Sequence, residues 1–461
     1  MAQSVPDYGG RGMSLYTRLV SGVLFPLHER LKGHSTVALR RQMEEDQWLA
    51  PEAIAANQLL RLRDFLSHIG QHVPHYRDLF QRLDFDPHSL QSLDELARLP
   101  LLDKARIRAA GDALRSELAG NLQRFNTGGS SGEPLVFYLD NERVSHDVAA
   151  KWRATRWWGV DIGDREVVLW GSPIELGAQD RVRLWRDRLL RTRLLSAFEM
   201  SPARMDAYLQ QIRRLRPRML FGYPSAISLL AARAQAQGIA MGNVGLQVVF
   251  VTSERLYDHQ RSAIEACFAC PVANGYGGRD AGFVAHQCPA GSLHLTADDQ
   301  IVEIIDEQGN AVAPGQSGEI VVTHMATRAF PFVRYRTGDI GRLGTQPCAC
   351  GRGLPVLAEV EGRSTDFLVA QDGTRVHGLA LIYILRDMPE VSAFKIIQHT
   401  VDQVAVELIP GPGFGQGQIT RIHEGFRRRL GQGVQVDVRQ VAELPAEKSG
   451  KFRYVVSRVG Q

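Results

Sequence analysis

Short apolar segments alternate with amphipathic helical patterns between about residues 120 and 340, and this alternation constrains the fold more than any other feature. Four segments predict buried strands that end at loops: EVVLWG, RMLFGYP, LQVVFVTSE and CPVANGYGG. Between them, MDAYLQQIRRL and AISLLAARAQAQG have the apolar spacing of helices. The alternation predicts an α/β body, in which ligands bind at loops beyond the carboxyl ends of the strands.

A different pattern occupies the last part of the chain. FKIIQHTVDQVAVELIPG predicts a strand hairpin, GQITRIHEGFRRRLG a helix and VQVDVRQV another strand, which together make a compact α+β unit. We therefore expect an α/β protein with these parts: a large N-terminal α/β body at 1–361 with a possible helical extension at 1–35, a hinge at 362–366, and a small, mobile C-terminal α+β domain at 367–461.

The composition is ordinary for a globular protein of more than one domain, with 461 residues and a net charge of +4. No apolar run is long enough to span a bilayer, and the N-terminus lacks the layout of a signal peptide. The basic clusters RVRLWRDRLLRTR and RRRL are short and interrupted, which is typical of solvated helix faces and argues against nucleic-acid binding. We expect a cytoplasmic protein. The sequence leaves its oligomeric state open, and a homodimer is one possibility.

The N-terminal segment SLYTRLVSGVLFPLHERL is amphipathic. A membrane surface could accept its apolar face, but charged residues such as Arg18, Glu29 and Arg30 interrupt the segment. We expect it to pack on the protein body. Two further helical patterns, TVALRRQMEEDQWL and AIAANQLLRLRDFLSHIGQH, follow it.

The segment FNTGGSSGEP, residues 125–134, allows two functional interpretations. Its G-x-S-x-G letters match a serine nucleophile elbow, but that motif needs a helix after it, whereas LVFYLD predicts a strand. It also lacks the Gly-Lys-Ser/Thr of a Walker phosphate loop. What remains is either a structural turn or an anion-binding turn that offers backbone N–H groups and three hydroxyls.

Four further motifs follow this loop: GYGGRDAG at 275–282, YRTGD at 335–339, EGRSTD at 361–366 and SGKFR at 449–453. In this order and spacing the five segments resemble those of the adenylate-forming ligase superfamily. The chain resembles most closely its phenylacetate–CoA ligase branch and the capsule-biosynthesis relatives of that branch. The resemblance extends from about residue 40 to residue 457, and five ordered motifs are far more specific than any one of them.

The resemblance implies which residues bind ATP and Mg²⁺. The loop that covers the β- and γ-phosphates corresponds to six residues: Thr127, Gly128, Gly129, Ser130, Ser131 and Gly132. Tyr276 and Gly277 correspond to the motif beside adenine and the α-phosphate, and Asp280 to the acidic residue that helps to hold Mg²⁺.

The same resemblance implies roles for three residues later in the chain. Asp339 corresponds to the aspartate that binds the ribose hydroxyls, and Arg363 to the arginine that reaches the nucleotide and begins the hinge. Lys451 corresponds to the catalytic lysine that reaches the α-phosphate and the carboxylate. A carboxylate that attacks a phosphate needs fixed positive charge, and a lysine on a mobile domain can supply it for one step only.

Two residues depart from the family pattern. Glu133 stands where the family loop commonly has lysine, and a carboxylate there would repel triphosphate unless it points away. Asp280 stands where the family usually has glutamate, so its contact with the metal is expected to be indirect.

Four residues in loops rich in proline and glycine suit a structural zinc site: Cys288, His294, Cys348 and Cys350. Three thiolates and one imidazole would complete a closed tetrahedral shell. Reduced thiols without metal are the alternative. A rival set would include Cys267 and Cys270, but these lie where a helix passes into a buried strand, and we interpret them as core residues.

The sequence thus predicts ATP-dependent activation of an aromatic or other apolar carboxylic acid to acyl-AMP, followed by transfer to coenzyme A. An amine or hydroxyl acceptor, such as a saccharide precursor, and a non-catalytic nucleotide-binding relative are the alternatives. Aromatic residues are candidates to line the acyl pocket: Trp157, Trp158, Phe221 and Tyr223.

Overall fold

The chain divides into two compact units, described here from a computed structural model. The first comprises Met1–Thr337 and Gly341–Val360, and the second comprises Gly338–Ile340 and Glu361–Gln461. The structure describes residues 14–126, 135–170, 181–197, 200, 202–363, 367–373, 375–444 and 453–459. The predicted fold class, a large α/β body with a small C-terminal domain of helices and strands, is confirmed.

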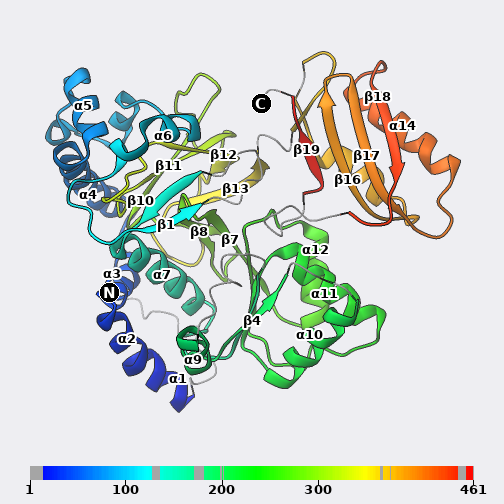
Figure 1. Cartoon of the computed structure of the whole chain (residues 1–461), viewed down its shortest axis with the longest axis horizontal. Helices are drawn as coiled ribbons and strands as arrows, with labels where there is room; N and C mark the ends of the chain where they lie inside the picture. Colours follow the sequence, from blue (N-terminus) through cyan, green and yellow to red (C-terminus); the bar gives the residue numbers. More distant parts are fainter. Residues whose placement is uncertain are drawn as a thin grey trace. The chain divides into compact units, whose positions relative to one another are not determined.

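A parallel block of strands forms one half of the eleven-stranded sheet in the first unit (Figure 1). Its order is β4 (Thr192–Ser196), β3 (Glu166–Trp170), β5 (Met219–Gly222), β6 (Val248–Thr252) and β7 (Val272–Gly278). Each parallel pair places the carboxyl ends of its strands at the same edge. The four strands predicted for this region are therefore confirmed, and β4 is an addition at the sheet edge.

Beyond β7 the sheet continues through strands that the helix–strand alternation did not predict in full. The order is β8 (Gly282–Gln287), β9 (Leu293–Leu295), β13 (Val356–Arg363), β12 (Tyr335–Leu343), β11 (Gly318–His324) and β10 (Gln300–Ile305). β8 runs antiparallel to β7 and to β9, so the direction of the sheet changes at the β7–β8 turn.

Both faces of the parallel block are covered, because alternate residues of its strands point to opposite sides. On one face Leu220 and Val249 lie in a core with α10 (Pro202–Leu215), α11 (Pro224–Ala236) and α12 (Asp258–Phe268). On the other face Phe221 and Phe250 pack with Trp157 and Ala154, and Ala154 belongs to α7 (Asn141–Arg156). This two-sided burial accounts for the continuous apolar runs in the sequence.

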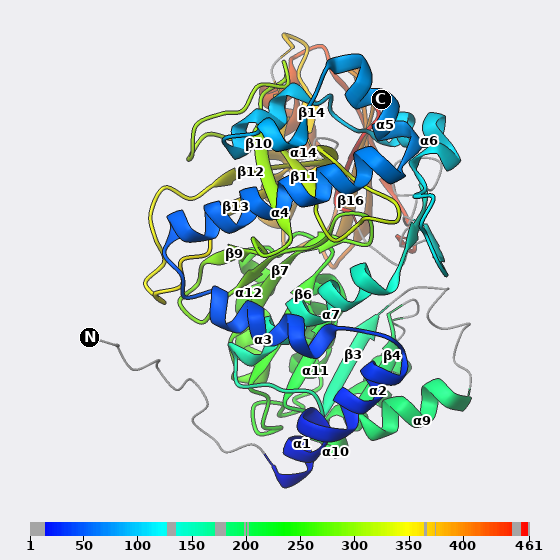
Figure 2. The same cartoon turned by 90° about the vertical axis from the view of Figure 1, so that its left-hand side faces the viewer.

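Helices from the N-terminal third cover the other half of the sheet. The long helix α4 (Pro51–His72) crosses β10 and β11 (Figure 2), and its residues share one core with Ile301 and Val322. Three short helices pack against α4: α5 (Pro74–Leu83), η2 (Pro87–Ser89) and η3 (Leu93–Arg98). Next to them lie η4 (Gly111–Leu114) and α6 (Lys104–Ala110), whereas α3 (Thr36–Asp46) packs on α7. A hairpin of β1 (Gln123–Asn126) and β2 (Val136–Leu139) follows, and the strand β2 confirms that no nucleophile elbow helix follows the glycine-rich loop.

The N-terminal segment forms three consecutive helical elements, α1 (Leu15–Leu19), the π-helical η1 (Val20–Leu24) and α2 (Phe25–Leu31). One face packs on the body as predicted, because Val20 is fully buried and the Phe25 ring meets the Trp152 ring edge-on at 5.1 Å. Within the described residues, no helix is both long and apolar enough to cross a membrane.

The second unit is built on a four-stranded sheet. Its order is β18 (Gln435–Gln440), β17 (Gln403–Pro410), β16 (Val391–Thr400) and β19 (Val455–Ser457). The helices α13 (Leu379–Arg386) and α14 (Gln416–Leu430) and a small ribbon of β14 (Phe367–Val369) and β15 (Arg375–His377) complete it. The predicted hairpin, helix and strand are β16–β17, α14 and β18.

Candidate active site

The motif GYGGRDAG forms the turn between β7 and β8. A Cβ atom at Gly277 would lie 2.1 Å from the carbonyl oxygen of Gly282, a distance that real Cβ atoms do not reach. Only glycine therefore allows the two strands to pair this closely. The turn places Tyr276 and Asp280 together at the carboxyl end of β7, where an α/β sheet presents ligand-binding residues.

Asp280 is held by the second motif, YRTGD. The hydroxyl of Tyr335 donates a hydrogen bond to Asp280 Oδ2 at 2.7 Å, and the backbone N–H of Ala281 donates to Oδ1 at 3.1 Å. Tyr335 is buried, whereas Asp280 is half-buried. Each carboxylate oxygen has two lone pairs, so Asp280 keeps the capacity to accept a further donor or to contact a cation.

A second contact joins the same two motifs. The hydroxyl of Tyr276 donates to Thr337 Oγ1 at 3.4 Å, and the Thr337 hydroxyl donates to the carbonyl of Ile320 at 2.8 Å. Motifs that lie about 60 residues apart in the chain are thus tied together by two side-chain hydrogen bonds.

The remaining residues of the predicted nucleotide site are distributed as follows. Asp339 is a half-buried residue of β12, and it lies in the short segment that groups with the second unit. Arg363 is the last residue of β13. The loop from Thr127 to Gly132, together with Glu133, and the catalytic candidate Lys451 lie outside the described residues. Of the predicted set, the structure brings together Tyr276, Gly277 and Asp280.

Aromatic rings follow one another across the carboxyl ends of the parallel strands. Trp170 ends β3, and its ring stacks on Tyr223 at 4.4 Å and on Phe221 at 5.9 Å. Phe221 in turn stacks on Phe250 at 6.0 Å, and Lys151 Nζ lies 4.0 Å from the centre of the Phe221 ring. Two of the four predicted pocket aromatics, Phe221 and Tyr223, therefore lie at the strand ends.

The other two predicted aromatics, Trp157 and Trp158, share a core with Phe221 but contact the loops around Cys288 and His294. The Trp157 ring meets the ring of His294 at 5.8 Å, and Trp158 Nε1 donates to the carbonyl of Gln287. Both indoles thus pack beside the cysteine-bearing loops.

Comparisons with known proteins agree with this arrangement. Residues 127–327 match the family model of AMP-binding enzymes, and residues 368–458 match that of the CapK C-terminal domain. The chain belongs to the AMP-binding, adenylate-forming superfamily.

The sequence identity to individual relatives is low, but the alignments cover most of each chain. Protein CapK of Staphylococcus aureus is 23% identical over 410 residues, which cover 87% of this chain and 88% of CapK. The phenylacetate–coenzyme A ligase of Thermus thermophilus is 23% identical over 419 residues, or 85% and 87% of the two chains. A crystal structure of 2-hydroxyisobutyryl-CoA ligase in the postadenylation state has the same fold, with a TM-score of 0.72 at 20% identity, covering 89% of this chain and 91% of that one.

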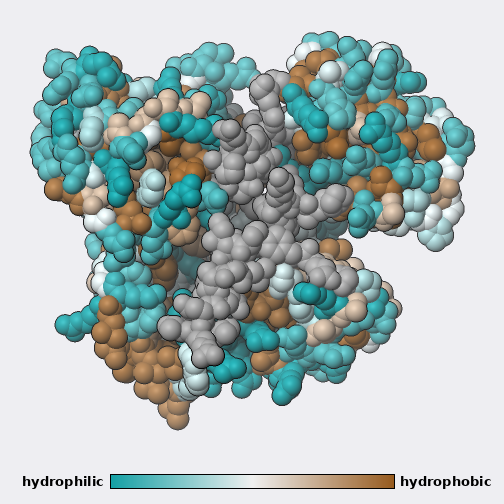
Figure 3. All heavy atoms as spheres, in the orientation of Figure 1, coloured by the Kyte–Doolittle hydropathy of each residue, from teal (hydrophilic) through white to brown (hydrophobic). Residues whose placement is uncertain are grey.

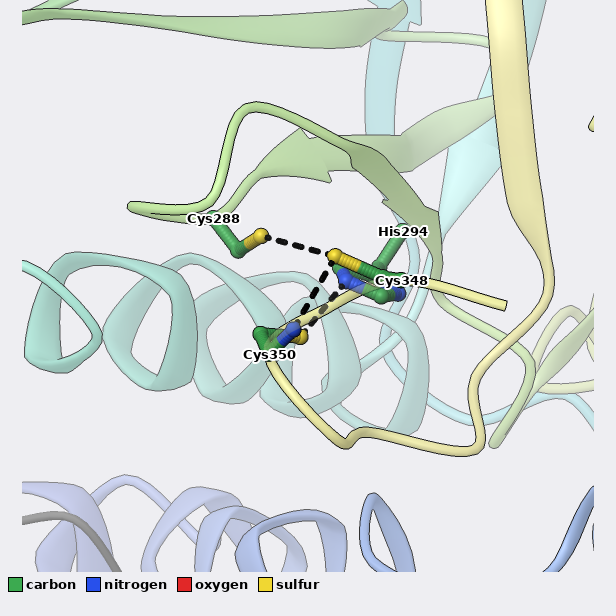
Figure 4. A group of neighbouring side chains, drawn as sticks. All are labelled: Cys288, His294, Cys348 and Cys350. Atoms are coloured by element: carbon green, nitrogen blue, oxygen red, sulfur yellow. Dashed lines mark hydrogen bonds between the residues drawn. The ribbon is translucent and has the colours of Figure 1, made fainter. Parts of the chain in front are cut away.

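At the other end of β8, this adenylate-forming protein holds the four predicted zinc ligands close together (Figure 4). Cys288 directly follows β8, His294 lies in β9, and Cys348 and Cys350 come from the loop between β12 and β13. Their ligand atoms all lie within 4.8 Å of one another. The Sγ atoms of Cys288 and Cys348 are 3.6 Å apart, close to the ~3.8 Å between two thiolates on one tetrahedral Zn²⁺.

The chemistry of this cluster suits a closed metal site. His294 Nδ1 lies 3.2 Å from the carbonyl of Leu354, a contact that would fix the proton on Nδ1 and leave Nε2 free for a metal. A hydrogen bond between Cys288 and Cys350, together with burial, raises the pKa of Cys288, and the same bond lowers the pKa of Cys350. One of the two sulfurs is therefore predisposed to be a thiolate.

Cys267 and Cys270 do not join this cluster in the described part of the chain. Cys270 is buried in the core beneath α12, and burial raises its pKa to about 12 and that of Cys267 to about 11. This agrees with their interpretation as core residues.

A largely buried charged cluster, which no sequence pattern indicated, lies beneath the β7–β8 turn. It consists of Arg143, His146 and Asp147 of α7 with Asp299 and His324. Arg143 Nε donates to Asp147 Oδ2 at 3.0 Å, and His146 Nδ1 lies 2.8 Å from Asp299 Oδ2. A Cβ atom at Gly282 would lie 2.6 Å from Arg143 Nη2, so this glycine allows the guanidinium to lie directly against the turn. The cluster supports the turn that carries Asp280.

Electrostatics within this cluster favour the charged forms of Asp299 and His146, whereas burial and the charge of Arg143 lower the pKa of His324. Burial raises the pKa of Asp299, but His324, His146 and Arg143 outweigh it and lower this pKa to about 2. Burial lowers the pKa of His146, but the hydrogen bond and charge of Asp299 outweigh it and raise this pKa above its usual value. Arg143, His146 and Asp147 lie on α7, where the polar positions follow no motif, and they meet Asp299 and His324 only because α7 covers this part of the sheet.

Proposed function

We propose that this protein activates a carboxylic acid with ATP to form acyl-AMP, and then transfers the acyl group to coenzyme A. The observation that carries the proposal is the pair of hydrogen bonds, Tyr335 to Asp280 and Tyr276 to Thr337, that ties two nucleotide motifs together at the strand ends. Membership of the adenylate-forming superfamily and the similarity to proteins named phenylacetate–coenzyme A ligase support it.

The proposed chemistry has two balanced steps. In the first, a carboxylate oxygen attacks the α-phosphorus of ATP, the bond to the β-phosphate breaks, and pyrophosphate leaves. In the second, the thiolate of coenzyme A attacks the acyl carbon, and AMP leaves with the electron pair of the broken C–O bond. The first step brings negative charge together, so fixed donors and cations are its main requirement.

Asp280 fits the role of a magnesium ligand, because its oxygens each accept one hydrogen bond and retain lone pairs. Mg²⁺, when bound, would neutralise phosphate charge. Tyr335 would hold the Asp280 carboxylate in one orientation, and Tyr276 would lie beside the adenine. We assign the ribose hydroxyls to Asp339 and the phosphates to the loop from Thr127 to Gly132.

In the same proposal Lys451 supplies the positive charge for acyl-AMP formation, and Arg363 contacts the nucleotide at the start of the hinge. Rotation of the C-terminal domain about residues 362–366 would withdraw the lysine before thioester formation. The stacked rings of Trp170, Tyr223 and Phe221 favour a carboxylic acid whose acyl group is aromatic or otherwise apolar.

The alternative acceptor is an amine or a hydroxyl group. The observation that favours it is that residues 368–458 match the family model of the CapK C-terminal domain. The first step would be the same with either acceptor.

We also propose that Cys288, His294, Cys348 and Cys350 bind one structural Zn²⁺. Four protein ligands would leave no open position for a substrate, so such a metal would stabilise the two loops and take no part in the reaction. Metal analysis of purified protein should find about one zinc per chain.

The experiment that tests the proposed function is pyrophosphate release over a panel of aromatic and aliphatic acids, with and without coenzyme A. Release that depends on the acid, with a thioester formed when coenzyme A is present, is the expected result. Acid-dependent release with a product only from amines or alcohols would select the alternative acceptor. Binding of ATP without release from any acid would indicate a non-catalytic relative.

A further inference from the structure

The outer face of the N-terminal helices carries a continuous apolar stripe. It consists of Leu15, Leu19, Val23, Leu27 and Leu31, whose exposed fractions range from 48% to 84%. Figure 3 shows brown spheres gathered at the lower left, where Figure 1 places α1 and α2. Single exposed leucines are ordinary on a protein surface, but five in a row on one helix are not.

The π-helical turn η1 keeps these five residues in line. Residues four apart in an α-helix advance by about 40° around the axis per step, so the stripe would wind away over four steps. A π-helical turn contains more residues per turn, so residues four apart within it rotate in the opposite direction around the axis. This rotation returns the stripe to the same side of the helix. The stripe therefore runs along about 25 Å of helix, from Leu15 to Leu31, on one side.

A second helix extends this apolar surface. The hydroxyl of Tyr16 donates to the carbonyl of Leu189, and the Arg191 guanidinium lies 3.6 Å from the Tyr16 ring centre, which joins α1 to the end of α9 (Arg181–Leu189). On α9 the indole of Trp185 is 70% exposed, and Leu189 is also exposed. Eleven large apolar residues are exposed among the described residues, and seven of them lie on these two helical segments. We call these seven residues, the five of the stripe with Trp185 and Leu189, the N-terminal apolar surface.

The charges beside the N-terminal apolar surface have one sign. Its exposed charged residues in the described segments are all cations: Arg18, Arg30, Lys32, Arg188 and Arg193. The two acids there are neutralised or withdrawn, since Glu29 is buried against His34 and Thr36, and Asp187 pairs with Arg186. A second copy of this chain would bring the same cations face to face in a two-fold contact.

We propose that the N-terminal apolar surface binds the protein to an anionic membrane surface, with α1 and α2 lying in the plane of the interface. An amphipathic helix with leucines on one face and cations beside them is suited to this environment, and an exposed tryptophan commonly anchors it. Cations near anionic lipid add an attraction that a neutral partner would not provide. The proposal does not depend on which reaction the protein performs.

The test is flotation of the full-length protein with vesicles of phosphatidylcholine alone and with 30% phosphatidylglycerol. The protein should float with the anionic vesicles, and 0.5 M salt should weaken the binding. Val23→Glu with Leu27→Glu should reduce the bound fraction about tenfold or more, because the changes place charge in the apolar stripe. Both residues are exposed, so the fold should be retained.

A matched control is Leu229→Glu with Leu60→Glu, which adds the same charge at exposed leucines outside this surface and should leave binding unchanged. As an independent measurement, anionic vesicles should shift the fluorescence emission to the blue, and Trp185→Phe should remove most of the shift.

Three outcomes would overturn the proposal. One is no binding to either vesicle by a folded protein. Another is a dimer in solution that Val23→Glu with Leu27→Glu dissociates, which would assign the surface to a second copy of the chain. The third is vesicle binding that the control reduces as much as the paired change in the stripe, which would indicate a general effect of charge.

Discussion

The two ends of strand β8 carry two sites of opposite character. At its start, Asp280 is half-buried, and its oxygens retain the capacity for a further ligand. Past its end, Cys288 is fully buried, and three more ligand atoms surround it within 4.8 Å. This difference suggests a division between chemistry and stability: the first end is accessible enough to exchange ligands, whereas a metal at the second end would be enclosed by four protein ligands.

The largest effect should come from the proposed catalytic lysine, because it concerns the reaction itself. If Lys451 serves acyl-AMP formation, Lys451→Ala should slow that step about 10²–10³-fold, or roughly 3–4 kcal/mol, because it removes a charge needed most in the transition state. Thioester formation from chemically made acyl-AMP should be spared. Equal slowing of both steps, measured separately, would contradict the two-position model for this lysine.

The closed end should respond in stability and not in catalysis. Cys348→Ser should release the metal and lower the free energy of unfolding by about 2–4 kcal/mol, because a structural metal contributes directly to folding. The check is metal content together with chemical denaturation. Cys267→Ser is the control, since this cysteine lies outside the cluster. A protein purified without zinc whose stability Cys348→Ser leaves unchanged would remove the proposed metal site.

A smaller effect should separate positioning from binding at the open end. Tyr335→Phe removes the hydrogen bond to Asp280 Oδ2 and should lower kcat/KM for pyrophosphate release about tenfold, or about 1.4 kcal/mol. Tyr76→Phe is the control, because Tyr76 is an equally buried tyrosine whose hydroxyl contacts the backbone at Pro331 and Val333. If both changes reduce activity alike, loss of stability and not loss of Asp280 orientation explains the result.

The smallest effect concerns the charged cluster beneath the turn. The pKa of His146 is raised in the folded protein, so its stabilising contribution is complete below about pH 6.5 and is lost as pH rises through the folded value. Asp299 stays ionised over this range. In urea denaturation, the free energy of unfolding should therefore fall between pH 6 and pH 9. This fall should be smaller in His146→Asn. His259→Asn is the control, because His259 is exposed and lies outside the cluster. The prediction is wrong if His146→Asn has the same pH profile of stability as the unchanged protein.

Much of the fold could be predicted because its signals are local. The runs at β3, β5, β6 and β7 are short and apolar, and helical spacing separates them, so each element could be recognised within its own window. The antiparallel half of the sheet was predicted less fully. β9 has only three residues, and β12 begins with a motif whose residues alternate in no regular way.

The candidate site, too, was predictable only in part: its residues could be proposed from the sequence, but their contacts could not. Spacing along the chain was enough to propose Tyr276, Asp280 and the four zinc ligands, because each belongs to a short segment with distinctive residue types. The partnership of Tyr335 with Asp280 was not predictable, although both residues lie in quoted motifs. It depends on the placement of β12 relative to the β7–β8 turn, which no local pattern encodes.

The sequence by itself determined the order of the elements, the two-part organisation and the residue types available for chemistry, because periodicity and spacing act over a few residues at a time. Only the tertiary structure decided which segments meet. It placed Arg143 against Gly282, gathered the cysteines of two loops around His294, and covered one face of α1 and α2 while leaving the other exposed. These contacts arise from the packing of helices on a sheet whose neighbouring strands are distant in the chain.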